Sequence, residues 1–190
     1  PAQQRKPRRK RRGRQQEIWA NNFSSIRNQR IYGLLKWKKL IPFHVGISQH
    51  SVQNYVYMDS NQLMQQYQEN INIQQLNAGV QLKLWRIHLD NDVYFQNISS
   101  DKIRAPRLIG NHSLYYKGYL FKKAMWSKFG VDLRAHDPFQ AYAFQPASGT
   151  FYLQDDFTTN WQLNLDGFFS FKIQKFRFTH SYRLWINGIR

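Results

Sequence analysis

Short runs in which apolar and polar side chains alternate are the feature that most constrains how this chain can fold. Between residues 35 and 45, apolar side chains recur at the odd positions, with a basic interruption at Lys39, while the even positions are Lys36, Lys38, Leu40, Pro42 and His44. The segment 80–84 alternates in the same way. Because successive side chains of a β-strand point to opposite faces of the sheet, this period of two predicts strands with one apolar face.

Further strands are predicted from the residues that favour pleated, half-buried surfaces. Aromatic residues make up 16% of the chain and recur with Val, Ile and Thr in short runs. The apolar face changes phase after residue 84, which predicts a bulge there or burial of the strand on both faces. It changes again after Gln174, so a single long strand over 168–185 is expected to bend near Lys175. The other strand candidates are 52–58, 114–121, 141–144, 150–153 and 161–165.

Helix is scarce in this pattern. The spacing of apolar residues predicts one helix over 60–69 and a weaker one over 122–128. Long connections are expected at 90–112 and 130–138. Many strands, few helices and long loops together predict an all-β fold, a single jelly roll of the Greek-key β-sandwich type.

The distribution of charge divides the chain into three regions. Residues 1–16 form an arginine-rich arm, 17–34 a transition segment, and 35–190 the jelly-roll domain. The arm offers nothing to bury, so we expect it to be disordered when free. Its bases are Arg5, Lys6, Arg8, Arg9, Lys10, Arg11, Arg12 and Arg14. The side chains expected to anchor the transition segment are Trp19, Phe23 and Ile26.

The formal net charge of +17 makes a polyanion the first partner to consider. Nucleic acid is preferred over a membrane, because the arm lacks a second, apolar face and no apolar run reaches the ~18–20 residues of a helical span. Neither a secretory signal nor membrane insertion is expected. Beyond the arm, nucleic-acid contacts are predicted at Arg27, Arg30, Lys36, Lys38 and Lys39.

Two basic-aromatic stretches could also stack on unpaired bases. These are LKWKKLIPF at 35–43 and KIQKFRF at 172–178. In both, however, ring and charge alternate. We therefore favour rings in an apolar core and bases on the wet or lumen-facing side of the same strands.

The titratable residues give no catalytic pattern. The chain has no cysteine, and its six histidines are scattered without a metal-binding spacing. Asp90 with Asp92, and Asp155 with Asp156, could hold a hard cation through oxygen, but a turn is the favoured interpretation of both pairs. We therefore expect no enzymatic activity, no metal and no cofactor.

A family resemblance rests on the overall plan and on two stretches. A basic arm precedes an aromatic-rich β-body, GVQLKLWRIHLDND at 79–92 resembles an inner basic-aromatic strand, and FKIQKFRF at 171–178 resembles a last strand. In these features the chain resembles the capsid proteins of small icosahedral viruses. Among them it is most similar to the circovirus-like capsid proteins of circular single-stranded DNA viruses.

This resemblance implies a jelly-roll shell protein that self-assembles in about sixty copies or a multiple of that number. It implies that the arm packages a single-stranded genome, DNA rather than RNA, and that the same bases act as a nuclear-import signal. The implied locations are the virion and the host nucleus, and a host cell-surface receptor is an implied partner. Two alternatives stay open: a ribosomal or other ribonucleoprotein component, and a β-barrel module that binds single-stranded nucleic acid.

Overall fold

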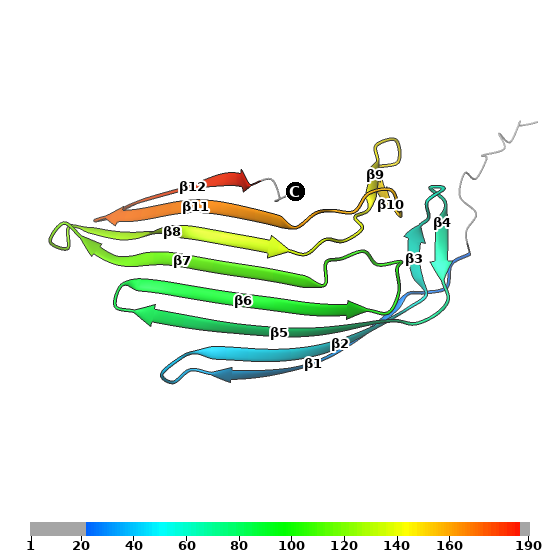
Figure 1. Ribbon diagram of the computed structural model, residues 1–190, viewed down its shortest axis with the longest axis horizontal. Helices are drawn as coiled ribbons and strands as arrows, with labels where there is room; N and C mark the ends of the chain where they lie inside the picture. The colour runs from blue at the N-terminus through cyan, green and yellow to red at the C-terminus, as the bar shows by residue number, and fades with distance from the viewer. Residues whose placement is uncertain (1–21, 187–190) are drawn as a thin grey trace, which may run out of the picture.

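The structure is a computed structural model that describes residues 22–186. All the elements formed by these residues are strands (Figure 1), which confirms the all-β fold class. A helix long and apolar enough to span a membrane does not occur within residues 22–186. The arm, with its eight predicted nucleic-acid contacts, and Trp19 lie outside the described residues.

Eight long strands form one antiparallel sheet in which each strand pairs with the next long strand along the chain. This order contains no Greek-key crossover among the described strands, so the finer prediction of a jelly roll is not confirmed. The strands are β1 (Arg27–Trp37), β2 (Phe43–Gln53), β5 (Ile71–Leu84), β6 (Ile87–Ile98), β7 (Leu108–Leu120), β8 (Met125–His136), β11 (Gln162–Ile173) and β12 (Phe176–Ile186).

The two ends of the sheet carry different connections (Figure 1). At one end, which we call the short-turn end, four brief turns join β1 to β2, β5 to β6, β7 to β8 and β11 to β12. Each turn contains a non-glycine residue with positive φ, for example Trp85 at 55° and Gln174 at 51°. Left-handed backbone at such residues lets the chain reverse within a few positions, at a cost of about 1 kcal/mol each.

At the other end the connections are long and fold into a small cluster of their own. We call this the loop-end cluster; it comprises the hairpin β3 (Tyr55–Met58) with β4 (Met64–Tyr67), the hairpin β9 (Ala143–Gln145) with β10 (Thr150–Tyr152), and the loop 99–107. Leu153 N donates to Met58 O at 3.0 Å, which joins the two hairpins. Both side chains are buried.

Burial within this cluster raises the pKa of Tyr55 to about 12, with a hydrogen bond to Tyr142 as the second cause. The folded cluster therefore favours the neutral phenol, and the stability that this contributes is present below pH 10 and lost as pH rises towards 12. We expect the tyrosinate absorbance of the wild type minus that of Tyr55→Phe to titrate near pH 12. A midpoint near 10, the ordinary value, would contradict the burial of this phenol.

Two helix predictions are wrong. The segment 60–69 forms a turn and β4, because the Asp59 carboxylate accepts hydrogen bonds from the backbone N–H groups of Asn61 and Leu63 at 3.0 and 2.8 Å. These bonds close a turn rather than cap a helix. The segment 122–128 forms the β7–β8 turn and the start of β8.

The predicted long connections are also corrected, because 90–112 contributes most of β6 together with the start of β7, and 130–138 most of β8. Where a bulge near residue 85 and a bend near Lys175 are predicted, the chain makes hairpin turns. Directly paired residues share a face, and Leu84 pairs with Ile87 while Ile173 pairs with Phe176. The change of phase is therefore a reversal of direction that keeps the apolar residues on one face.

Candidate functional site

The register of the large sheet gathers most of the apolar side chains of all eight strands on one face, which we call the apolar face. Because directly paired residues share a face, each row of pairs can be followed across the sheet. One row consists of Leu82, Leu89, Leu114, Val131, Gly167 and Tyr182. The next row towards the short-turn end consists of Leu84, Ile87, Tyr116, Phe129, Phe169 and His180.

Charge is confined to the opposite face, which we call the polar face. Of the charged residues in the eight long strands, Arg27 at the start of β1 is the exception that falls on the apolar face. Lys36, for example, pairs with His44, which pairs with Gly79, which pairs with Asp92. The charges of the eight strands therefore lie, with this one exception, on a single side of the sheet.

The apolar face is not covered by other described parts of the chain. Leu84 is 79% exposed, Ile47 65% and Leu35 64%. The buried apolar residues lie elsewhere, at Met58 and Leu153 in the loop-end cluster and at Ile71 where β5 begins. An exposed apolar surface of this extent marks a face that contacts a protein or a membrane.

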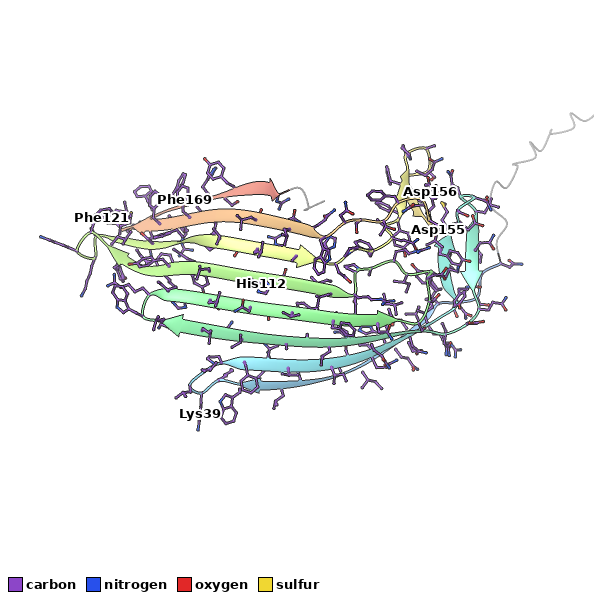
Figure 2. The ribbon with its side chains drawn as sticks, in the orientation of Figure 1. Lys39, His112, Phe121, Asp155, Asp156 and Phe169 are labelled. Carbon is purple, nitrogen blue, oxygen red and sulfur yellow. The ribbon has the colours of Figure 1, made fainter. Side chains whose placement is uncertain are left out.

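Aromatic side chains concentrate on the apolar face near the short-turn end. Figure 2 shows Phe121 at the β7–β8 turn and Phe169 close to the same end. Further towards the loop end, the apolar residues on β5 run from Leu84 to Leu76, eight positions and about 27 Å of strand. Polar residues follow at Gln74 and Asn72. The aromatic members at the short-turn end are Trp37, Phe43, Tyr116, Phe129, Phe169, Phe171, Phe176 and Phe178.

One polar pair interrupts the apolar face halfway along the strands. His112, which is labelled in Figure 2, pairs with Asn91 across β6 and β7, and His112 Nδ1 lies 2.8 Å from Asn91 Oδ1. Each side chain thus supplies a hydrogen-bond partner for the other, which lowers the cost of placing both on an apolar surface.

The acids of the polar face all have partners. Asp166, 8% exposed, accepts from Arg134 and Arg183 at 3.1 Å each. Asp92 Oδ1 lies 3.3 Å from His44 Nε2. The remaining two acids accept hydroxyl hydrogen bonds, Asp90 from Tyr115 at 3.1 Å and Asp132 from Ser113.

A stack of rings crosses the polar face beside these acids. His88 and Tyr115 are parallel with centroids 4.9 Å apart, and Phe168 lies 6.4 Å from Tyr115. Lys128 Nζ sits 4.2 Å from the Tyr115 ring centroid, a cation–π contact. Gly130 lies between Tyr115 and Phe168 in the register, so the two large rings have room on either side of it.

Bases collect at the short-turn end of the sheet. The segments 36–44, 81–89, 115–130 and 170–178, which form the four turns and the adjoining strand ends, contain no acid. Figure 2 shows Lys39 at the β1–β2 turn. We call the bases of these segments the basic collar: Lys36, Lys38, Lys39, Lys83, Arg86, Lys117, Lys122, Lys123, Lys128, Lys172, Lys175 and Arg177.

A cavity of about 460 Å³ opens within the basic collar, between the β7–β8 and β11–β12 turns. We call it the collar pocket. Its charged lining comes from Lys123, Lys172 and Arg177, and its aromatic lining from Tyr119 and Trp126. Such a lining suits a small anion with an apolar part.

A second cavity, of about 580 Å³, lies in the loop-end cluster. Its lining carries charges of both signs, including Asp101, Arg104, Arg107 and Asp137. Arg104 is held by Asp155 at 2.7 Å and by Gln140. This cavity thus has no net excess of either charge.

The five predicted contact residues in the described region lie along β1 and its turn. Arg30 and Lys36 are on the polar face, Arg27 is on the apolar face, and Lys38 and Lys39 are in the β1–β2 turn. They therefore do not converge on one groove. The other collar bases, from Lys83 to Arg177, are not among the predicted site residues. For the bases near the β11–β12 turn, the alternation of rings and charges in 172–178 is the sequence pattern that indicates them.

The turn predicted around Asp90 and Asp92 is wrong, because both lie within β6 and face the polar side, while Asn91 between them faces the apolar side. Asp155 and Asp156 lie in the loop after β10, as predicted (Figure 2), and Asp155 pairs with Arg104. Groups of three or more potential metal ligands do not occur within the described part of the chain.

Comparison with known proteins adds one match. Residues 13–187 match the model of a family described as Putative porin. No curated protein matches the chain. No solved structure matches it.

This match overturns the functional predictions made from the capsid resemblance. The chain is not placed among viral capsid proteins. The predictions that depend on that resemblance are therefore wrong: the shell of about sixty copies, the packaged single-stranded genome and the receptor. The virion and the host nucleus are likewise wrong as locations, and the exclusion of membrane insertion is wrong. The expectation that the chain is not an enzyme stays a prediction.

Proposed function

From the premise that the chain belongs to the family described as Putative porin, we propose that its eight-stranded sheet spans an outer membrane. The apolar face contacts lipid, and the polar face lines a water-filled path for solutes. The observation that carries this proposal is the confinement of charge to one face over eight consecutive strands. Membrane-spanning sheets require this alternation, because lipid-facing and water-facing residues follow one another along each strand.

The dimensions of the sheet support the proposal. Its strands have 11 to 14 residues, enough for the ~9–11 residues that cross a bilayer with a tilt. The ~27 Å of apolar strand on β5 correspond to about 20 Å of height at a tilt of ~40°, close to the ~25 Å band of such proteins. The aromatic residues at one end of this band match the position of an interfacial girdle.

The arrangement of the connections supports it as well. Spanning sheets of outer membranes have short turns on one side and longer loops on the other, as the two ends of this sheet do. Within the described strands, β1 and β12 each pair along one edge. Lipid offers no hydrogen-bond partners, so every backbone N–H and C=O group in the membrane must be paired within the protein. The finer proposal is therefore that these two edges pair with each other or with further strands in the membrane.

A second candidate is a water-soluble protein whose apolar face is covered by another protein layer. It shares the two-sided sheet and differs in what covers the apolar face. The experiment that distinguishes the two candidates must therefore show whether lipid or protein lies next to the apolar face, and not only that water does not reach it.

Cysteine substitution along 81–84 on β5 tests this, since the chain has no cysteine of its own. In lipid vesicles, Gln81→Cys and Lys83→Cys should react with a water-soluble maleimide several-fold faster than Leu82→Cys and Leu84→Cys. All four native side chains are exposed in the isolated sheet, so the alternation reports the surroundings rather than packing within the chain.

The control uses a fluorophore attached to the same cysteines, in vesicles that contain brominated lipid. Emission from positions 82 and 84 should be quenched, and emission from positions 81 and 83 should not. A sheet covered by a protein layer would give slow labelling at 82 and 84 without quenching, which would contradict the proposed function.

A further inference from the structure

The basic collar carries an uncompensated positive charge. Among the described residues, its bases form no ion pair with a carboxylate. Arg86 donates instead to two neutral oxygens, Tyr116 Oη and Tyr119 O, at 2.9 Å each. The acids of the polar face lie outside the four collar segments, and two of them, Asp92 and Asp166, are paired with bases outside the collar.

Two pairs of collar bases face each other directly across neighbouring strands. Lys117 pairs with Lys128 on β7 and β8, and Lys172 pairs with Arg177 on β11 and β12. Like charges directly opposite each other in a sheet destabilise it. An anion bound between them would relieve this repulsion.

These four bases lie on the polar face. A lipid headgroup at the edge of the apolar face would instead meet the rings of Phe129, Phe169 and Phe171. The anions that the collar can attract are therefore those dissolved in the proposed water-filled path. Side chains of one sign along a path raise the local concentration of counter-ions at its mouth.

We propose that the path along the polar face selects anions and that the basic collar is its filter, with the collar pocket as a binding site for small carboxylates or phosphates. This inference rests on the proposed function, because the collar filters solutes only if the polar face conducts them. Lys172 and Arg177 provide two cationic donors at the pocket, and Trp126 and Tyr119 provide an apolar wall.

The test uses the full-length protein in a planar bilayer with a KCl gradient. The reversal potential should show that chloride permeates more readily than potassium. In the double variant Lys172→Gln/Arg177→Gln, the chloride-to-potassium permeability ratio should fall several-fold. Inorganic phosphate should also reduce the chloride current through the wild type and do so less in this variant.

The matched control removes two bases far from the collar, with Arg30→Gln/Arg107→Gln. Arg30 lies on the polar face of β1 nearer the loop end, and Arg107 lies beside the loop-end cavity. Loss of the same number of charges there should leave the permeability ratio close to that of the wild type. Equal loss in both double variants would point to net charge alone and would overturn the assignment of the filter to the collar.

A measurement on the wild type alone guards against a variant that fails to fold. Raising KCl from about 0.1 M to about 1 M shortens the screening length from ~10 Å to ~3 Å, so the preference for chloride should weaken. A conducting protein that prefers potassium, or shows no preference at low salt, contradicts the proposed filter. Absence of any conductance contradicts the proposed function itself.

Discussion

Leu82→Arg should lower the free energy of unfolding from lipid bilayers by about 2 kcal/mol, because Leu82 lies between the midplane, where a guanidinium on a lipid-facing strand costs ~2–4 kcal/mol, and the interface, where it costs ~0–1 kcal/mol. Leu82 lies on the apolar face, in a row that continues through Leu89 and Leu114. The rows on both sides of it are also mainly apolar, so a charged side chain there cannot reach water without distorting the bilayer.

The matched control is Gln81→Arg, one residue away on the same strand and at the same depth. Gln81 is on the polar face and pairs with Asp90, so an arginine there meets water and an opposite charge. We expect a change within about 0.5 kcal/mol. Denaturant titration of both variants in vesicles, followed by tryptophan fluorescence, gives the comparison. Equal losses of stability at 81 and 82 would contradict a lipid-facing apolar face.

The alternation that identifies this surface could be read from the sequence, and with it the all-β class. The positions of the hairpin turns could not. At Trp85 and Gln174 the chain turns within a few residues without glycine, and the alternation resumes on the returning strand with its phase changed. A phase change of one residue is what a bulge also produces, so the pattern alone does not distinguish a bulge from a reversal.

The functional prediction failed for a related reason. An apolar run of ~18–20 residues is the signature of a spanning helix, whereas a spanning strand presents an apolar residue only at every second position. The stretch 80–84 fits the second pattern and escapes a search for the first. Membrane insertion was therefore excluded by a criterion that does not apply to strands.

The site was missed because charge in a sequence has no position in space. The net charge of +17 suggested a polyanion, and the most basic segment drew attention to residues 1–16. The collar instead combines bases from four turns that lie as far apart in sequence as Lys36 and Arg177. Only the pairing of the strands brings them to one end of one sheet.

Gly130→Ala should destabilise the sheet by about 1–3 kcal/mol, the range observed when atoms are forced into a packed site. A Cβ added at residue 130 would lie 2.5 Å from Tyr115 Cβ and would also contact the backbone oxygen of Leu114. Directly paired Cβ atoms ordinarily lie ~4.5–5.5 Å apart. Because these atoms belong to the backbone and the Cβ of β7 rather than to the Tyr115 ring, β7 and β8 must separate, which would loosen the contact between Tyr115 and Lys128.

The matched control is Gly167→Ala on β11, where an added Cβ has no atom within 4 Å. Because alanine loses less backbone entropy than glycine in a strand, this variant should be neutral or more stable by up to about 1 kcal/mol. Denaturant titration in vesicles would separate the two glycines. If Gly130→Ala proved as neutral as Gly167→Ala, β7 and β8 would lie farther apart at this position than the structure has them. The stacking of His88, Tyr115 and Phe168 beside the acids of the polar face would then not depend on Gly130.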